Sequence, residues 1–155
     1  MLRLCLLCLL STILLSCLSE PDCIITASNE VKIALSHAGY DDSVRFAKFD
    51  RIEVSGTDSV FHVGDSVSSV VLPVDPGSLQ TTFRFYYEIV EDTVTFSKED
   101  SVKVIYTRVT RVISPDCGAF NYFQDLAIVL STFAEATVNN SQLSTSDSKN
   151  ITVKL

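Results

Sequence analysis

The sequence predicts an all-β protein in which residues 23–155 form a single domain, an antiparallel β-sandwich. Several segments carry apolar residues at every second position, which is the pattern of strands with one buried face. These segments are rich in Val, Ile, Thr, Tyr and Phe, the residues that favour strands. Turn-forming residues separate them at intervals of about 8 to 15 residues, as expected for a sandwich and not for a βαβ fold.

Six alternating segments define the predicted strands. They are centred on residues 31–35, 52–54, 83–85, 94–96, 102–106 and 151–155. We expect the first strand to begin near Cys23. The clearest turn is Asp75-Pro76-Gly77, because Pro fixes one φ angle and Gly accepts a positive one. A further turn is predicted over residues 98–101.

Residues 120–137 fit either type of regular structure. Leu126, Leu130 and Phe133 lie near helical spacing, whereas Leu126, Ile128 and Leu130 alternate as in a strand. We favour a strand, because the segment follows a long predicted strand and precedes another turn.

The first 16 residues have the features of an export signal. Arg3 precedes an apolar run at residues 4–15, which at about 12 residues is too short to cross a bilayer. The run ends in an apolar pair and a small residue before Cys17, a pattern that resembles the lipobox of bacterial lipoproteins. The resemblance implies that residues 1–16 are a cleaved signal peptide, that Cys17 becomes the lipid-modified first residue and that residues 17–22 form a tether. An ordinary secretory signal with a chance cysteine is the alternative.

Lipid attachment would hold the protein on a membrane outside the cytoplasm. Residue 18 is Leu, not the Asp that commonly retains lipoproteins in the inner membrane. We therefore expect an anchor in the outer membrane, with the periplasmic side favoured over the cell surface.

Cysteine usage points to one disulfide. Of the five cysteines, two lie in the predicted signal peptide and Cys17 would carry the lipid, which leaves Cys23 and Cys117 in a compartment that permits oxidation. A Cys23–Cys117 bond would close a loop of about 95 residues and contribute roughly 4 to 5 kcal/mol. Two buried free thiols or intermolecular pairing are the alternatives. Two cysteines without further ligands do not form a metal site, and we expect neither metal nor cofactor.

Charge and motif content argue against nucleic-acid binding and known catalysis. The net charge is −7, and it becomes −8 without Arg3, with 11 basic and 19 acidic residues. Such a surface repels phosphate backbones, so nucleic acid is not an expected partner. The two histidines, His37 and His62, lie outside metal-ligand spacings, and nucleophile-elbow and phosphate-loop motifs are absent. We therefore expect a non-enzymatic protein without catalytic residues.

The triplet Asp-Ser/Thr-Val recurs five times, at residues 42–44, 58–60, 65–67, 92–94 and 100–102. In the favoured interpretation each triplet marks a turn that leads into a strand. The triplets also resemble the O-glycosylation sequon of Bacteroidota. That resemblance implies modification at Ser43, Ser59, Ser66, Thr93 and Ser101, and the two interpretations are compatible.

Most of the mature chain resembles a family of small Bacteroidota lipoproteins classified only as a domain of unknown function. The resemblance rests on Asp22-Cys23 and on segments at residues 70–74, 82–86, 100–106, 113–118 and 150–153. Its most specific part is the Cys117-Gly118 step after a long strand, and the early Cys23 supports the proposed disulfide. The resemblance implies an all-β, immunoglobulin-like envelope protein, and it carries over no catalytic residue.

We therefore expect a non-enzymatic lipoprotein, anchored in the outer membrane, that binds or scaffolds an unknown envelope protein or glycan. The alternatives are a glycan- or small-ligand-binding module and an enzyme with an unrecognised site. A sugar-binding platform would have to use tyrosines, because the chain has no Trp. The candidates are Tyr86, Tyr87, Tyr106 and Tyr122, most of which should be half-buried in strands. Exposed coplanar tyrosines would favour glycan binding, and a pocket that joins a histidine with carboxylates would favour an enzyme.

Overall fold

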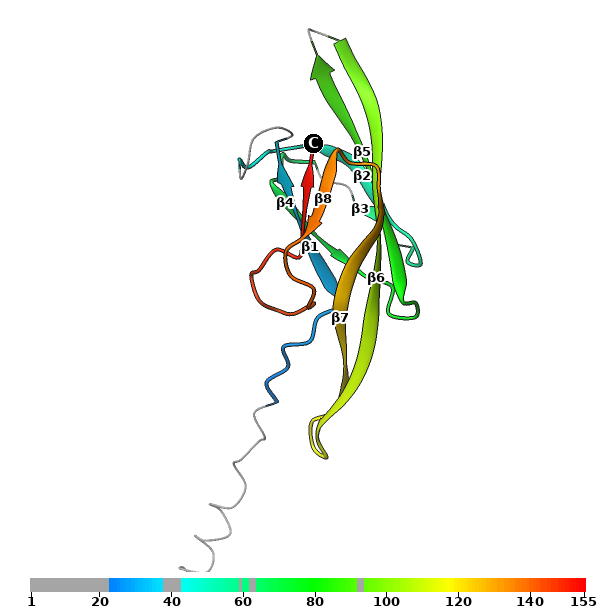
Figure 1. Ribbon diagram of the computed structural model, residues 1–155, viewed down its shortest axis with the longest axis vertical. Helices are drawn as coiled ribbons and strands as arrows, with labels where there is room; N and C mark the ends of the chain where they lie inside the picture. Colours follow the sequence, from blue (N-terminus) through cyan, green and yellow to red (C-terminus); the bar gives the residue numbers. More distant parts are fainter. Residues whose placement is uncertain (1–22, 38–42, 59, 62–63, 92–93) are drawn as a thin grey trace, which may run out of the picture.

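The computed structural model describes residues 23–37, 43–58, 60–61, 64–91 and 94–155. Within these ranges the chain forms nine strands in two sheets, with no helix, so the predicted all-β fold is confirmed (Figure 1). No described segment forms a helix long and apolar enough to pass through a membrane. Cys17, the proposed lipidation residue, lies outside the described residues.

The smaller sheet has four strands in the order β4-β1-β9-β8. Its members are β1 (Glu30–Ser36), β4 (Ser69–Pro73), β8 (Glu135–Val138) and β9 (Ile151–Lys154). The first and last strands of the chain, β1 and β9, lie parallel in the middle of this sheet, while the pairs β1–β4 and β8–β9 are antiparallel. A parallel pair needs a long connection, which the intervening strands supply.

The larger sheet has five strands in the order β3-β2-β5-β6-β7. Its members are β2 (Phe49–Val54), β3 (Val60–Phe61), β5 (Gln80–Glu91), β6 (Val94–Ser114) and β7 (Gly118–Ser131). The 21-residue β6 pairs with β5 over residues 94–105 and with β7 over residues 102–114. The two hairpins therefore extend in opposite directions, and both project beyond the sandwich (Figure 1).

One apolar core lies between the two sheets, and it follows the alternation seen in the sequence. Phe83, Phe85 and Tyr87 of β5 are buried, whereas Arg84, between the first two, and Glu88, after Tyr87, are exposed. Each fully buried apolar side chain of this size contributes about 1.5 to 3 kcal/mol. The other strands contribute Val31, Ile33, Leu35, Ile52, Val102, Val104, Ile151 and Val153.

Residues 120–137 form strands, as favoured from the sequence. They contain most of β7 and the start of β8, and Leu126 of β7 is buried in the core. A helix would have been compatible with local propensity, but the pairing of β7 with β6 and of β8 with β9 satisfies most backbone groups of this segment.

Three sequence-based predictions are wrong. The sandwich is not purely antiparallel, because β1 and β9 pair in parallel. The first strand begins at Glu30 and not near Cys23, because the residues before it pair with the loop at residues 139–150 through Ala27–Ser144. The predicted turn at residues 98–101 lies inside β6. Asp100 within it is buried, and its carboxylate accepts hydrogen bonds from the hydroxyls of Tyr87 at 2.6 Å and Thr132 at 2.8 Å. Hydrogen bonds from β5 and from the residue that follows β7 thus allow a polar residue to occupy the core face of a strand.

A bulge marks the point where β6 and β7 leave the sandwich. Asp125 and Leu126 lie opposite Tyr106, so that two residues of β7 face one of β6. Asp125 takes a positive φ of 57°, which Asp tolerates better than most residues. The Leu126 amide donates to the Ser141 carbonyl at 3.0 Å and so pairs with the loop instead of β6. Bulges of this kind bend a strand and increase its twist.

Gly56, in the turn after β2, is a position where adding a single methyl group should be costly. Its φ is +81°, and a Cβ there would overlap the carboxylate of Asp75, whose Oδ1 accepts a bond from the Gly77 amide at 2.8 Å. We expect Gly56→Ala to lower the free energy of unfolding by about 2 to 3 kcal/mol. Gly118→Ala is the control, because its φ is +73° but nothing lies within 4 Å of the new Cβ. It should cost only about 1 kcal/mol. If urea denaturation shows that the two variants lose the same free energy of unfolding, the proposed overlap between a Cβ at position 56 and Asp75 is contradicted.

Candidate functional site

The arm, defined here as residues 108–122, is the hairpin at the free ends of β6 and β7. Its two strands pair from Val109–Tyr122 towards the turn, and Thr110 donates to the Asn121 carboxamide oxygen at 2.8 Å. The guanidinium of Arg111 lies 5.0 Å from the ring centre of Tyr122 on one face of the arm. These contacts keep the two-stranded ribbon paired where no second sheet covers it.

The turn of the arm is joined to the start of the described chain by the Cys23–Cys117 disulfide, with Cα atoms 5.7 Å apart. The predicted pairing of these cysteines is therefore confirmed. The Cys117 amide also donates to the Ser114 hydroxyl at 3.0 Å, which holds the turn that presents Cys117. Cys23 is thus fixed to the tip of a projecting hairpin.

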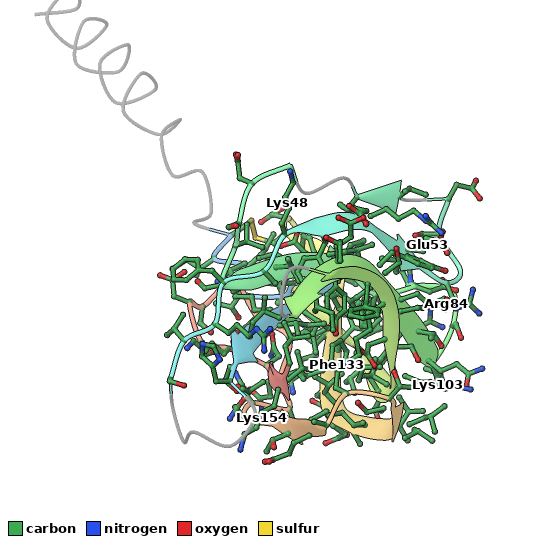
Figure 2. All side chains as sticks on the ribbon, turned by 90° about the horizontal axis from the view of Figure 1, so that it is seen from above. Lys48, Glu53, Arg84, Lys103, Phe133 and Lys154 are labelled. Carbon is green, nitrogen blue, oxygen red and sulfur yellow. A yellow bond between two sulfur atoms is a disulfide. The ribbon has the colours of Figure 1, made fainter. Side chains whose placement is uncertain are left out.

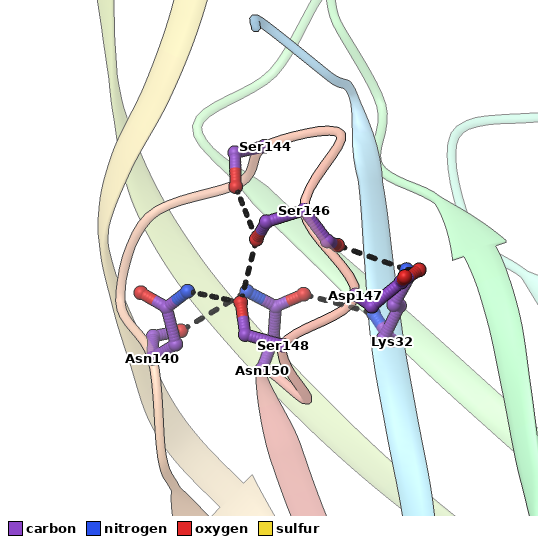
Figure 3. A network of polar contacts seen from close by, with 7 residues as sticks. All are labelled: Lys32, Asn140, Ser144, Ser146, Asp147, Ser148 and Asn150. Atoms are coloured by element: carbon purple, nitrogen blue, oxygen red, sulfur yellow. Dashed lines mark hydrogen bonds and ion pairs between the residues drawn. The ribbon is translucent and has the colours of Figure 1, made fainter.

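A polar network holds the loop at residues 139–150 against β1 (Figure 3). Asn150 is 3% exposed and uses its whole carboxamide. Its oxygen accepts from the Lys32 amide at 3.0 Å, and its nitrogen donates to the carbonyls of Asn140 and Gln142 at 3.1 and 2.9 Å. Buried polar groups satisfied in this way fix one conformation of a loop.

The same loop carries an exposed row of hydroxyls. The Ser146 hydroxyl oxygen lies 2.8 Å from that of Ser144 and 2.7 Å from that of Ser148. The Lys32 ammonium donates to the Ser146 carbonyl at 2.9 Å (Figure 3). The loop in turn binds the segment that leads from the disulfide to β1, because the Thr145 amide donates to the Thr26 carbonyl at 3.1 Å. Sequence alternation gave no signal for this loop.

The outer face of the five-stranded sheet carries an ordered ionic cluster. Arg51 pairs with Glu53 at 2.9 Å, and its guanidinium lies 3.7 Å from the ring centre of Tyr86. The Tyr86 hydroxyl donates to the other oxygen of Glu53 at 3.1 Å. The hydrogen bond from Arg51 lowers the pKa of Glu53 and raises that of Arg51. Figure 2 shows Glu53 on this outer side with Arg84 and Lys103, while Phe133 lies inside.

The outer face of the four-stranded sheet is hollowed. A cavity of about 450 Å³ is bounded by polar side chains that include Ser43, Glu135, Thr152 and Lys154, and Glu135 pairs with Lys154 at 2.8 Å. This ion pair lowers the pKa of Glu135. The Ser43 hydroxyl is buried without a hydrogen-bond partner among the described residues.

A family model described as a family of unknown function (DUF6452) matches residues 49–154. The chain belongs to this family. No curated protein and no solved structure matches it. The DUF6452 match runs from the start of β2 to the end of β9, so it includes Cys117, Asn150 and the ionic cluster. Strand β1 and Cys23 precede it.

The tyrosines considered for glycan binding in this DUF6452 member do not form a bare platform. Tyr87 and Tyr106 are buried, and burial raises the pKa of each hydroxyl. Tyr87 donates to Asp100, and Tyr106 donates to the Asp75 carbonyl at 2.7 Å. Tyr86 and Tyr122 are half-buried, and an arginine covers one ring face of each.

The histidines do not meet in a catalytic arrangement within the described part of the chain. His37 is exposed at the end of β1, and His62 lies outside the described residues. No described group of three or more His, Cys, Asp or Glu side chains is placed to hold a metal ion.

The residues of the recurring triplets are dispersed over the structure. Ser66 is exposed outside the strands, whereas Ser101 is half-buried within β6, between β5 and β7, and the Ser43 hydroxyl is buried. Ser59 and Thr93 lie outside the described residues. Of the described candidates, Ser66 is therefore the one that a transferase would reach most readily.

Proposed function

We propose that the protein is a non-enzymatic lipoprotein, anchored through Cys17 in the outer membrane, that binds or scaffolds another component of the cell envelope. Residues 1–16 are the cleaved signal peptide in this proposal, residues 17–22 the tether and residues 23–155 the folded domain, held on the periplasmic side. The partner is an envelope protein or glycan, and nucleic acid is excluded by charge.

The Cys23–Cys117 disulfide is the observation that carries this proposal. Disulfides of this kind persist in oxidising compartments and are rare in the cytosol. Export is therefore supported by a feature of the folded domain, independently of the apolar segment at the start of the sequence. The bond begins only six residues after Cys17, so it also supports a short tether with a fixed exit point.

A binding role, as opposed to catalysis, is supported by how the polar groups are used. Asp100, Tyr87 and Asn150 are all buried, and each is engaged in hydrogen bonds that join strands or hold a loop. The features that face outward are two projecting hairpins and an ordered ionic cluster. Such surfaces suit recognition of another macromolecule.

An immunoglobulin-like relationship is also proposed. Two sheets around one core support it. The consecutive strands β5, β6 and β7 form a meander within one sheet, which differs from the Greek-key connections common in immunoglobulin domains.

Binding of a small polar ligand or glycan is the alternative. The cavity on the four-stranded sheet supports it, because the Ser43 hydroxyl there lacks a partner among the described residues and a ligand would supply one. The coverage of Tyr86 and Tyr122 by arginines speaks against a stacked sugar on these rings.

Substitution of the proposed lipidated cysteine tests the anchor. We expect Cys17→Ala to abolish acylation and to release the protein from the membrane fraction, because the acyl chains on Cys17 are the proposed anchor. Cys117→Ala is the matched control: it removes a thiol and the disulfide but should leave the protein with the membranes. Fractionation of the native host's envelope measures both. Retention of the Cys17→Ala protein with membranes would refute the proposed anchor.

A further inference from the structure

We propose that the tip of the arm, together with Ile24, rests on the lipid surface and inserts apolar side chains among the headgroups. This inference rests on the proposed anchor at Cys17. It adds a second, protein-made contact with the bilayer that fixes how the domain stands on the membrane.

The covalent geometry brings the tip of the arm close to the bilayer. Cys23 follows Cys17 by six residues, which span at most about 20 Å when fully extended. The disulfide joins Cys23 directly to Cys117 in the turn of the arm. Both the arm and the beginning of the described chain leave the sandwich on the same side (Figure 1). An acylated Cys17 therefore holds this tip within reach of the headgroups.

Three side chains around this tip are apolar and exposed, and they lie beside the exposed Asp116 of the turn. Ile24, next to Cys23, is 78% exposed, and on the arm Val112 is 75% and Ile113 38% exposed. Three exposed β-branched apolar residues beside one disulfide need an explanation, because a strand that faces only water is expected to carry polar residues there. Insertion into the interfacial layer of a membrane buries them without a protein partner.

Aromatic and basic residues follow the apolar tip towards the sandwich. Phe120 and Tyr122 are half-buried on the arm, and Arg111 lies over the Tyr122 ring. Amphipathic aromatic rings and long basic side chains are the groups that settle at the headgroup level, with their polar ends in water. Apolar side chains near the tip are thus followed by aromatic and basic side chains nearer the sandwich, which matches the change from acyl chains to headgroups to water across a membrane interface.

Charge distinguishes the two ends of the molecule. The arm carries Arg108, Arg111 and Asp116, a net charge of +1 in a chain of −7. Residues 88–99, which form the opposite hairpin, carry Glu88, Glu91, Asp92, Lys98 and Glu99, a net charge of −3. An anionic lipid surface therefore favours the arm and repels the opposite hairpin. Glu20 and Asp22 of the tether are acidic and weaken the electrostatic attraction of this end to anionic lipid. Insertion of apolar side chains is therefore the main contribution to the membrane contact, and charge selects which end of the domain faces the bilayer.

The contact would make the domain stand upright. With the arm on the bilayer, the β5–β6 hairpin points away from the membrane, towards whatever the protein meets in the envelope. A lipid anchor alone leaves the domain free to tumble about its tether, whereas two adjacent contacts restrict that motion.

Single tryptophans report this contact, because the chain contains none. Val112→Trp places the probe at the tip of the arm, and Phe96→Trp is the matched control near the end of the β5–β6 hairpin, at a position 49% exposed. Each full-length variant is expressed with its signal, purified as the lipidated protein and inserted into vesicles of phosphatidylethanolamine and phosphatidylglycerol with brominated acyl chains. Flotation first shows whether the protein is vesicle-bound, and urea denaturation shows that both variants fold like the wild type.

We expect the Val112→Trp emission to shift to the blue and to lose about half of its intensity in brominated vesicles, with no change for Phe96→Trp. Floating protein with neither probe quenched would refute the contact and leave the anchor intact. Equal quenching of both probes would mean that the domain lies flat, which also refutes it. Shielding of Val112→Trp only in native envelopes, and not in pure lipid, would assign the tip to a protein partner instead. Protein that does not float would refute the proposed anchor and the inference with it.

Discussion

Replacing Cys23 and Cys117 together by alanine is expected to lower the free energy of unfolding by about 4 kcal/mol. The two residues are 94 positions apart, so the bond closes a loop that contains β1 to β6 in full. Its main effect is to restrict the unfolded chain, and that effect grows with loop length. A loss of this size is a large part of the stability of a domain of this length.

Urea denaturation of the wild type and of the double variant measures this loss. A reducing agent should shift the midpoint of the wild type to that of the variant and leave the variant unchanged. If both proteins unfold at the same urea concentration, the disulfide does not stabilise the domain, and its role would be confined to positioning the arm.

Asn150→Asp should produce the second large loss, about 3 kcal/mol at neutral pH. The substitution is isosteric, but it replaces the amide that donates to the carbonyls of Asn140 and Gln142 by a carboxylate oxygen. The site is 3% exposed, so the new charge would face two carbonyl oxygens without water. The loss should shrink as the pH falls, because burial raises the pKa of the new carboxyl and its protonated form can donate one of the missing bonds.

Asn139→Asp is the matched control in the same loop. The Asn139 side chain is exposed, and its oxygen accepts from the Thr152 hydroxyl at 2.8 Å, a bond that a carboxylate retains. The change in charge is the same, yet we expect a loss below about 0.5 kcal/mol. Urea denaturation at two pH values measures the free energy of unfolding of each variant. Similar losses of this free energy for the two variants would show that the added negative charge, and not the buried network, controls stability.

The alternation of apolar and polar residues was sufficient to predict the strands that have one buried and one exposed face. Phe83 and Phe85 flank Arg84 in the sequence, and in the structure the two rings are buried while the arginine is exposed. Cysteine counting was sufficient to pair Cys23 with Cys117, because the other cysteines lie at or before the predicted anchor. These features depend on local pattern or on elimination, which a single sequence contains.

The features that sequence analysis missed depend on partners far away in the chain. Asp100 resembles a turn residue locally, but Tyr87 and Thr132 supply hydrogen bonds that let it remain within β6. Asn150 resembles a loop residue, and its role depends on the Lys32 amide, 118 positions away. The parallel β1–β9 pair and the projection of the arm are likewise set by tertiary contacts, for which period-two alternation gives no signal.

The intact mass of the protein from its native envelope, with sequencing of its first peptide, tests the central claim most directly. We predict a chain that begins at Cys17, carries a diacylglyceryl thioether with an acylated amine, and has two hydrogens fewer than the reduced form because of the disulfide. Additional hexose-containing masses would reveal O-glycosylation, with Ser66 the first residue to examine. A first peptide that retains residues 1–16, or one with an unmodified Cys17, would contradict this account.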